Sequence, residues 1–488
     1  MKKKALLVTL LLVAVIALAA CNRDNNGGTA DTPTTPQETA PADTTPAADD
    51  TAEEPADEPE QDIPAHDLGG REVVIGNWWG DWSVDTAEPT TLAAEARLED
   101  RIHIMERYNF TMREENLGGW GYIQEMVTMS ILAGDPVADI VILDQAWLMP
   151  LLSQGLLAPI TSVDFRDTSE FNWNQNIINM TRDANDAPHG WTREIQTGGG
   201  VWFNMRLLEE AGIDPYLPFD LQMAGQWTWD AWLDMLRELT RDIDNDGIMD
   251  TWGIATFSQD ILGLALPSNN ARSVYRDANG VFHNQTNTPE FLEVLTFVNS
   301  LQHIENVQMP QPPDSEWNWF DQAFANSQVA MRTGGSFGPG GLFDMTDPVG
   351  FVTFPVGPSG DTHRFQANAN FFVIPATFGP EDVAEIMQAY MLWQRPLPGF
   401  DDPDGWKAGE YLRHSTPRSV DETLALFSRD GARFEPLWWP LLPGQGFSQS
   451  QLIAWRMWHD DSDPAAIIEE AQPVINEAIA DANRVAGN

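Results

Sequence analysis

The sequence predicts an α/β protein, and three observations support that prediction. Short apolar runs bounded by turn residues are typical of strands in a parallel sheet, and Arg71–Gly76 and Asp139–Leu143 have this form. Segments with a helical apolar period lie between them, over residues 92–108 and 122–133. The length of 488 residues exceeds what one hydrophobic core usually organises, so more than one domain is expected.

Strands and helices alternate in this region. Both helices have one apolar face, which contains Leu98, Ile102 and Met105 in the first helix and Ile123, Met126, Val127 and Ile131 in the second. Phe110–Met112 is a short apolar stretch between the two helices and is the expected middle strand. The order strand, helix, strand, helix, strand is the pattern of βαβ units, which build parallel sheets covered by helices.

The N-terminus has the form of a bacterial lipoprotein signal. Residues 1–20 begin with three lysines and continue as an apolar run that is short for a membrane-spanning helix. The sequence Leu18–Cys21 resembles a lipobox, and Cys21 is the only cysteine in the chain. The resemblance implies that Cys21 becomes the acylated new N-terminus, anchored to the outer face of the cell membrane, as at a Gram-positive surface. The alternative is an ordinary secretory signal followed by a chance cysteine.

Residues 21–67 are predicted to be a disordered tether. They are rich in Pro, Thr, Ala and acidic residues and contain no aromatic side chain, so they cannot bury enough apolar surface to offset the entropy of ordering. The remaining residues, 68–488, are expected to form the folded region. The formal net charge of −46 excludes nucleic acid as a partner, because phosphates would be repelled.

Five motifs follow one another after residue 130: Gly134–Asp144 with Leu151–Ile160, Gly200–Pro215, Trp227–Trp232, Val329–Phe337 and Ile467–Asn483. In this order they resemble the extracellular solute-binding proteins of sugar ABC importers, the maltose-binding-protein-like group also called family 1. The resemblance implies that residues 68–488 are a solute-binding region with a two-lobed periplasmic-binding-protein-like fold of type II and a ligand cleft between the lobes. Lobe 1 would hold about 70–195 and 350–400, and lobe 2 about 196–345 and 401–488.

The same resemblance implies a function. The chain would capture a carbohydrate, in particular an oligosaccharide, and deliver it as a monomer to ABC permease subunits in the membrane. No HExxH, CxxC or P-loop motif is present, so the sequence is not expected to encode an enzyme. The alternatives are a secreted, Trp-rich polysaccharide-degrading enzyme (a glycoside hydrolase or lyase) and, third, a surface adhesion protein without a small ligand.

The 20 tryptophans indicate where a sugar would bind. Sugars dock flat C–H faces on aromatic rings while neighbouring carboxylates and amides bind their hydroxyls, and open α/β sheets bind ligands at the carboxyl ends of strands. Two segments combine these groups after predicted strands, and the candidate ligand-binding residues are Trp78, Trp79 and Asp81 in the first and Asp144, Gln145 and Trp147 in the second. The alternative is that these indoles pack in the core, as expected for Trp229 and Trp232.

Further candidates are Ser336 and Phe337, the latter where the family often has a stacking tryptophan, and Trp438, Trp439 and Trp455, near the segment where the family commonly contributes an aromatic platform. Asn368 and Asn370 are candidates because they precede the apolar run Phe372–Ile374 and offer amides at the expected edge of the cleft. The two asparagines are equally well explained as ordinary turn residues.

Residues 242–253 resemble a Ca²⁺-binding loop. The pattern supplies oxygens from Asp242, Asp244, Asp246, the backbone of Ile248, and Asp250, with a glycine at the sixth position. Position 12 is Gly253 where an EF-hand has a bidentate glutamate, so the ligand set is incomplete by that standard. We expect a structural Ca²⁺, and the alternative is an acidic turn without metal.

Overall fold

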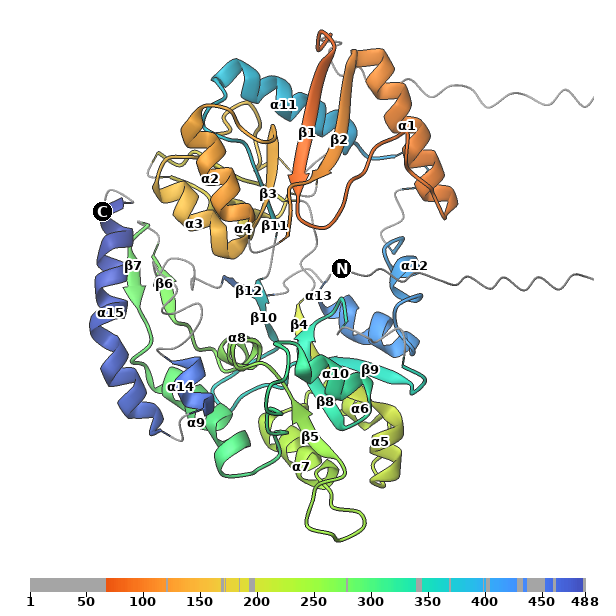
Figure 1. The fold of residues 1–488 in the computed structure, drawn as a ribbon, viewed down its shortest axis with the longest axis vertical. Helices are drawn as coiled ribbons and strands as arrows, with labels where there is room; N and C mark the ends of the chain where they lie inside the picture. The colour runs from red at the N-terminus through yellow and green to blue at the C-terminus, as the bar shows by residue number, and fades with distance from the viewer. Residues whose placement is uncertain are drawn as a thin grey trace, which may run out of the picture. The chain divides into compact units, whose positions relative to one another are not determined.

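Two four-stranded sheets organise the chain in the computed structural model (Figure 1). The structure describes residues 67–119, 122–167, 171, 173–183, 185–192, 198–277, 280–338, 345–367, 370–397, 399–400, 404–427, 433–436, 453–459 and 462–485. These residues all belong to one unit, Pro64–Asn488. The predicted signal, Cys21 and the tether lie outside the described residues. In the described part of the chain, no helix has both the length and the apolar composition that crossing a membrane requires.

The first sheet has the strand order β11-β3-β1-β2. Its parallel strands are β1 (Arg71–Asn77), β2 (Phe110–Asn116) and β3 (Ile140–Asp144), and β11 (Asn370–Val373) joins β3 in the antiparallel sense. The helices that accompany this sheet are α1 (Leu92–Tyr108), α2 (Ile123–Ala133), α3 (Gln145–Ser153), α4 (Gln175–Met180) and α11 (Pro380–Trp393). This sheet with its helices is called lobe 1 below. The predicted βαβ order is confirmed.

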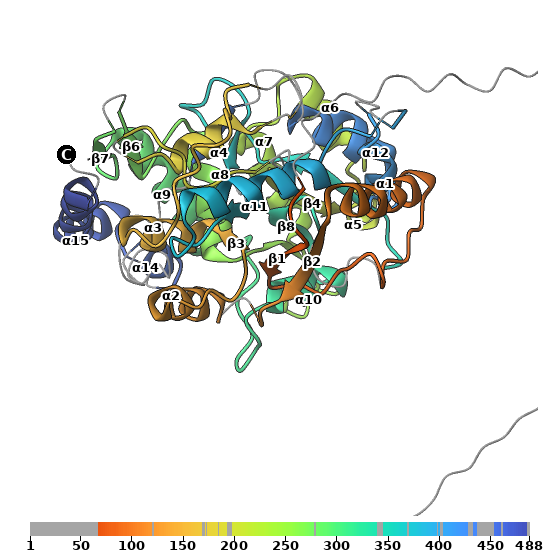
Figure 2. The same cartoon turned by 90° about the horizontal axis from the view of Figure 1, so that it is seen from above.

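The apolar face predicted for α1 is wrong in one respect. Ile102 is exposed, and the buried residues are Ile104, Met105 and Tyr108. Helix α1 lies beside α11 (Figure 2), and the Arg97 guanidinium donates to the carbonyl of Arg395, just after α11, at 2.6 Å, so the face that α1 buries includes contacts that its own periodicity does not predict. The face of α2 follows the prediction, with its isoleucines and Val127 buried.

The second sheet has the order β5-β8-β4-β9. Its strands are β4 (Gly199–Asn204), β5 (Trp252–Ala255), β8 (Val329–Gly335) and β9 (Val349–Thr353), and β4 runs antiparallel to both of its neighbours. The helices of this part are α5 (Met205–Glu210), α6 (Leu217–Met223), α7 (Trp229–Leu239), α8 (Ser258–Ser268), α9 (Pro289–His303) and α10 (Trp319–Ala325). This sheet with its helices is called lobe 2.

Helix α7 shows how the sequence sets one of these elements. The hydroxyl of Thr228 accepts a hydrogen bond from the amide of Ala231, which caps the first turn. Trp229, Trp232 and Leu236 then lie on one face and are buried. The prediction that these two tryptophans belong to the core is confirmed.

The boundary between the lobes differs from the expected one on the returning segment. β9 ends at Thr353 and pairs with β4, so residues 350–353 belong to the sheet of lobe 2 and not to lobe 1. The pairing of these two strands is close at Gly200. A Cβ added there would lie 2.1 Å from the carbonyl oxygen of Val352, so only glycine fits at this position of β4.

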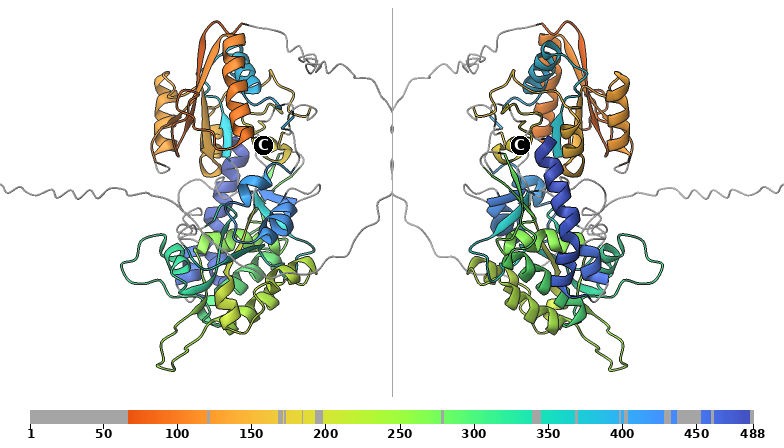
Figure 3. Two further views of the ribbon diagram at one scale, coloured as in Figure 1. Left: turned by 90° about the vertical axis from the view of Figure 1, so that its right-hand side faces the viewer. Right: turned by 90° about the vertical axis from the view of Figure 1, so that its left-hand side faces the viewer.

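Shorter elements complete the described chain. A hairpin is formed by β6 (Val274–Arg276) and β7 (Phe282–Asn284), and β10 (Arg364–Ala367) pairs in parallel with β12 (Arg433–Pro436). The remaining helices are α12 (Lys407–Glu410), the π-helix η2 (Ser419–Leu424), α13 (Ala425–Phe427), α14 (Ala454–His459) and α15 (Pro464–Val485). The long α15, dark blue in Figure 3, packs against β7 and α9.

Candidate functional site

A single buried asparagine shapes the turn that follows β1. The side-chain oxygen of Asn77 accepts hydrogen bonds from the amides of Trp79 and Gly80, at 3.0 and 3.1 Å. Its amide nitrogen donates to the carbonyl of Gly80 at 2.9 Å and to the carboxylate of Glu114 at 3.0 Å. Asn77 therefore fixes the direction in which the two following indoles leave the sheet.

Three of the predicted residues form one aromatic cluster at this edge. The Trp78 ring meets the Trp79 ring edge to face with centroids 4.9 Å apart, and meets Trp147 in the same manner at 5.1 Å. Trp147 is buried in the core, Trp78 is half-buried, and Trp79 is 52% exposed. The cluster thus consists of a buried support, a middle ring and an open aromatic surface.

Acidic groups lie beside the aromatic cluster. Burial raises the pKa of Glu114, while the hydrogen bond from Asn77 and the nearby charge of Arg101 lower it. The predicted residue Asp81 is exposed, and one of its carboxylate oxygens accepts from the amide of Asn116 at 2.8 Å. Glu114 was missed because the sequence indicated a strand that ended at Met112. β2 in fact continues to Asn116 and pairs in parallel with β1, with Asn77 opposite Asn116, and this pairing places Glu114 at the same edge of the sheet as the aromatic cluster.

Asp144 and Asn370 share the same edge of the lobe 1 sheet. Asp144 is the last residue of β3, Asn370 is the first of β11, and the antiparallel register places them opposite each other. Both are half-buried. Gln145 follows directly as the first residue of α3. Of the residues predicted for lobe 1, the structure therefore gathers these three at the carboxyl end of β3, and Asn368 lies outside the described residues.

Ser336 and Phe337 follow β8 in lobe 2. Ser336 is buried and Phe337 is 70% exposed. The turn is held by Trp202, whose indole nitrogen donates to the carbonyl of Gly335 at 2.9 Å. An exposed phenyl ring beside a buried hydroxyl is a second arrangement that suits a sugar face and its hydroxyls.

The neighbouring strand contributes groups that the sequence did not reveal. β5 runs parallel to β8, so Thr256 lies at the same edge, where its hydroxyl forms a hydrogen bond with Thr333. Burial raises the pKa of Asp260, in the first turn of α8, to about 6. The nearby Arg332 favours the ionised form of Asp260 and Asp321 opposes it. With 73 acidic residues in the chain, no spacing pattern could single out Asp260.

The last predicted aromatic group is only partly described. Trp455 lies on α14, is exposed, and contacts the ring of His459 with centroids 3.8 Å apart. Helix α14 packs against α8 and α9. Trp438 and Trp439 lie outside the described residues.

The acidic loop after α7 brings three carboxylates together. Oxygen atoms of Asp242, Asp244 and Asp250 lie within 4.8 Å of one another. Asp242 also accepts from the amide of Gly247 at 2.8 Å, and Asp246 accepts from the amide of Ile248 at 2.7 Å. These are hard oxygen donors on a tight turn, which is the donor type that Ca²⁺ prefers, so the residues fit that ion.

Comparisons with known proteins give the following findings. Residues 115–382 match the family described as bacterial extracellular solute-binding protein. Among curated protein sequences, none matches this chain.

Solved structures are similar in fold. A substrate-binding protein of an ABC transporter from Listeria monocytogenes, in complex with cycloalternan, is similar with a TM-score of 0.58 and 16% identity, over 84% of this chain and 99% of that one. The maltose/maltodextrin-binding domain from Bdellovibrio bacteriovorus, bound to maltotriose, has a TM-score of 0.53 and 12% identity, over 84% and 100%. UgpB from Mycobacterium tuberculosis, in complex with glycerophosphocholine, has a TM-score of 0.58 and 13% identity, over 84% and 98%.

Proposed function

The chain belongs to the bacterial extracellular solute-binding protein family, and we propose that it captures a carbohydrate, in particular an oligosaccharide, and delivers it to an ABC importer. The observation that supports this best is the edge of lobe 1, where the exposed Trp79 and the acidic residues Asp81 and Glu114 are all held at the carboxyl ends of β1 and β2, through Asn77 and Asn116. Similar folds solved with cycloalternan and maltotriose point to the same ligand class.

The chemistry of that edge matches a sugar. An indole face that is about half exposed offers apolar contact to C–H groups, and a large rigid ring loses little entropy on binding. Carboxylates accept hydrogen bonds from hydroxyl groups and orient the ring. The buried Trp147 supports Trp78, and Trp78 and the Asn77 turn hold Trp79 in place before ligand arrives, which lowers the cost of ordering the site.

In the proposed mechanism, ligand binding favours a closed arrangement of the two lobes. A sugar that contacts Trp79 in lobe 1 and Phe337 or Ser336 in lobe 2 binds that arrangement more tightly than an open one, and so shifts the population toward it. The closed form would then be the species that permease subunits accept.

Isothermal titration of the full chain with a panel of mono- and oligosaccharides tests this function. We expect a saturable heat for at least one member and a weaker response from Trp79→Ala. Flat heats for every sugar, together with binding of a peptide or polyamine, would exclude the carbohydrate class. Release of reducing ends from a polysaccharide during long incubation would instead support the glycoside hydrolase or lyase, an alternative that family membership disfavours.

We also propose that Cys21 is the acylated anchor that holds the protein on the extracellular face of the membrane. The basis is the lipobox-like sequence before this single cysteine. Labelling cells with an alkynyl fatty acid should mark the wild-type chain and not Cys21→Ser. Equal labelling of the two would contradict the proposal.

A structural Ca²⁺ is proposed for the loop after α7. Asp242, Asp244 and Asp250 would supply carboxylate oxygens, as their proximity allows, with Asp246 and the carbonyl of Ile248 completing the set. A bound divalent cation would offset the repulsion among these carboxylates.

A further inference from the structure

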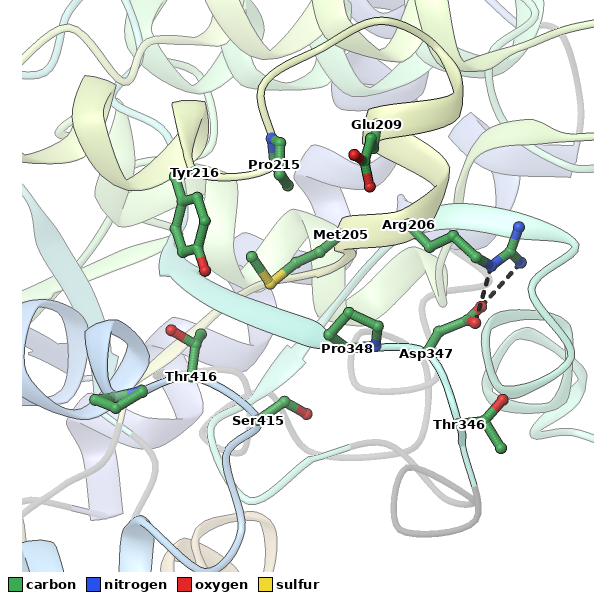
Figure 4. Close-up of a pocket in the computed structure, with 11 residues that line it drawn as sticks. Met205, Arg206, Glu209, Pro215, Tyr216, Thr346, Asp347, Pro348, Ser415 and Thr416 are labelled. Carbon is green, nitrogen blue, oxygen red and sulfur yellow. Dashed lines mark hydrogen bonds and ion pairs between the residues drawn. The ribbon is translucent and has the colours of Figure 1, made fainter. Parts of the chain in front are cut away.

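A pocket lies beside the helices of lobe 2, away from the edge formed by Gly335 and Ser336. β4 begins opposite Gly335 and ends at Asn204, and the pocket begins one residue later, at Met205. Its volume is about 540 Å³, within the range of roughly 300–1,000 Å³ that is usual for small-ligand sites. Figure 4 shows its lining residues, which come from α5, the loop before α6, and the segments around Asp347 and Thr416. This surface plays no part in the proposed transport site.

One wall of the pocket is already fixed. The Arg206 guanidinium donates to both carboxylate oxygens of Asp347, at 2.8 and 2.9 Å. Asp347 also accepts from the side chains of Asn204 and Ser327, at 2.8 and 2.6 Å. These bonds, that from Arg206 foremost, hold the pKa of Asp347 well below its usual range. The wall is therefore an ordered, charged surface at neutral pH.

The other polar groups of the pocket face solvent, apart from the Thr416 hydroxyl, which accepts a hydrogen bond from the amide of Arg418 at 3.4 Å. Glu209, Tyr216, Thr346 and Ser415 are exposed. In Figure 4, Tyr216 and Glu209 extend from above, with Met205 between them, and Ser415 lies across the pocket. A carboxylate and several hydroxyls around one concavity can bind the hydroxyl groups of a polyhydroxylated ligand.

The rest of the lining is apolar and rigid. Pro215, Pro348, Pro417 and Met205 line the pocket, and the ring of Tyr216 is 44% exposed. Proline and aromatic faces offer flat apolar contact with little entropy to lose.

We propose that this pocket is a second carbohydrate-binding site, which takes a neutral sugar unit of a larger glycan. An anionic ligand is disfavoured because Arg206 is already bonded to Asp347 and Glu210, and because the carboxylate of Glu209 would repel it. A hydrocarbon would displace water from Glu209 and from the hydroxyls of Tyr216, Thr346 and Ser415 without replacing the hydrogen bonds that water makes. A sugar ring satisfies both requirements, since its C–H face contacts Tyr216 and its hydroxyls donate to Glu209. The glycan is either a dissolved polysaccharide from which the transported sugar derives or the polymer of the cell wall.

Affinity electrophoresis of the full chain tests the proposal. The protein is run in native gels containing amylopectin, galactomannan, arabinoxylan or mixed-linkage β-glucan, with a glycan-free gel as reference, and is sedimented with purified peptidoglycan in parallel. We expect retention by at least one polysaccharide or co-sedimentation with peptidoglycan, and which arm responds identifies the source of the glycan. Tyr216→Ala and Glu209→Gln should each weaken the apparent affinity about tenfold, and Tyr216→Phe should lose less.

Matched variants keep the result specific. Tyr275 on β6 is 42% exposed and has the Arg272 guanidinium 5.8 Å from its ring, much as Arg418 lies 5.7 Å from Tyr216. Tyr275→Ala should therefore bind like the wild type, as should Trp79→Ala, which alters the proposed transport site only. No interaction of the wild type in any arm, or an unchanged affinity of Tyr216→Ala with native circular dichroism, would overturn the proposal. Retention lost equally in Trp79→Ala would also overturn it, because binding would then belong to the transport site.

Discussion

Trp147 meets Trp78 edge to face, with ring centroids 5.1 Å apart and an interplanar angle of 80°. Trp78 makes a similar contact with Trp79 at 4.9 Å. The cluster therefore runs from the buried Trp147 to the exposed Trp79. Substituting Trp147 should mainly affect stability, and substituting Trp79 should mainly affect ligand binding.

Trp79→Ala is expected to lower the affinity for the transported sugar by about tenfold, or about 1.4 kcal/mol, with little change in melting temperature. The reason is that its exposed ring contributes ligand contact more than core packing. Titration calorimetry measures the affinity. Trp317→Ala is the control, because Trp317 is 79% exposed and precedes α10 in lobe 2. Equal losses in the two variants would argue against a specific role for Trp79.

Trp147→Ala is expected to destabilise the fold by about 3–5 kcal/mol, because it leaves a cavity under Trp78 in the core. Trp147→Phe should cost less, since most of the volume is retained. Urea unfolding followed by circular dichroism gives the free energy. A cost below about 1 kcal/mol for the alanine variant would mean that Trp147 is not a packing support.

Asp260→Asn is expected to stabilise the protein at pH 7 and to have no such effect at pH 3. The folded pKa of about 6 lies above the unfolded value near 3.9, so the folded state binds more protons between these values. The contribution of Asp260 to the stability of the wild type should therefore fall as pH rises through this window, by at most about 3 kcal/mol, and the variant lacks this contribution. Urea unfolding from pH 3 to 7.5 measures the difference between the two curves. A difference that grows toward low pH would contradict the assignment.

Asp347→Asn should have the opposite pH dependence. The folded pKa of Asp347 lies below its unfolded value near 3.9, so its charge contributes stability above about pH 4 that is lost as pH falls through the folded pKa. We expect a cost of about 1–2 kcal/mol at pH 7, reduced because Arg206 is partly exposed, and a smaller cost at pH 3. Asp234→Asn, which alters an exposed pair with Arg237, should change the unfolding free energy little at either pH.

Removal of Ca²⁺ with EGTA is expected to lower the melting temperature by a few degrees, because an ion that binds only the folded state adds to its stability. Asp250→Asn should abolish the response, since it removes one of the three clustered carboxylates. Asp135→Asn, in an exposed position outside the loop, should retain it. Differential scanning calorimetry with and without EGTA measures the melting temperatures. Identical wild-type curves under the two conditions would contradict the proposed Ca²⁺ site.

Local patterns predicted much of lobe 1. The apolar runs of β1 and β3 and the period of α2 are consequences of which face each element buries, and they depend only on neighbouring residues. The face of α1 was misjudged because it includes contacts with α11, some 280 positions away in sequence. Periodicity carries no information about such contacts.

The candidate site was predictable where groups are adjacent in sequence and hidden where they are not. Trp78 and Trp79 directly follow a strand, so their place at the sheet edge could be inferred. Glu114 lies with them only because β2 pairs with β1. Thr256 and Asp260 lie near the end of β8 only because β5 pairs in parallel with that strand. Such neighbours require knowledge of the register, which one sequence does not contain.

The pairing of β11 with β3 has a consequence for how the chain is made. Asn370 cannot reach Asp144 until residues 145–369 have been synthesised and exported, so β3 has an unpaired edge throughout that interval. The sheet of lobe 2 lies entirely within this inserted segment and can assemble first. Closure of lobe 1 is then a late step that depends on a contact of long sequence separation, which slows folding. The interval in which the apolar β3 edge is open is when the protein is most exposed to aggregation and proteolysis.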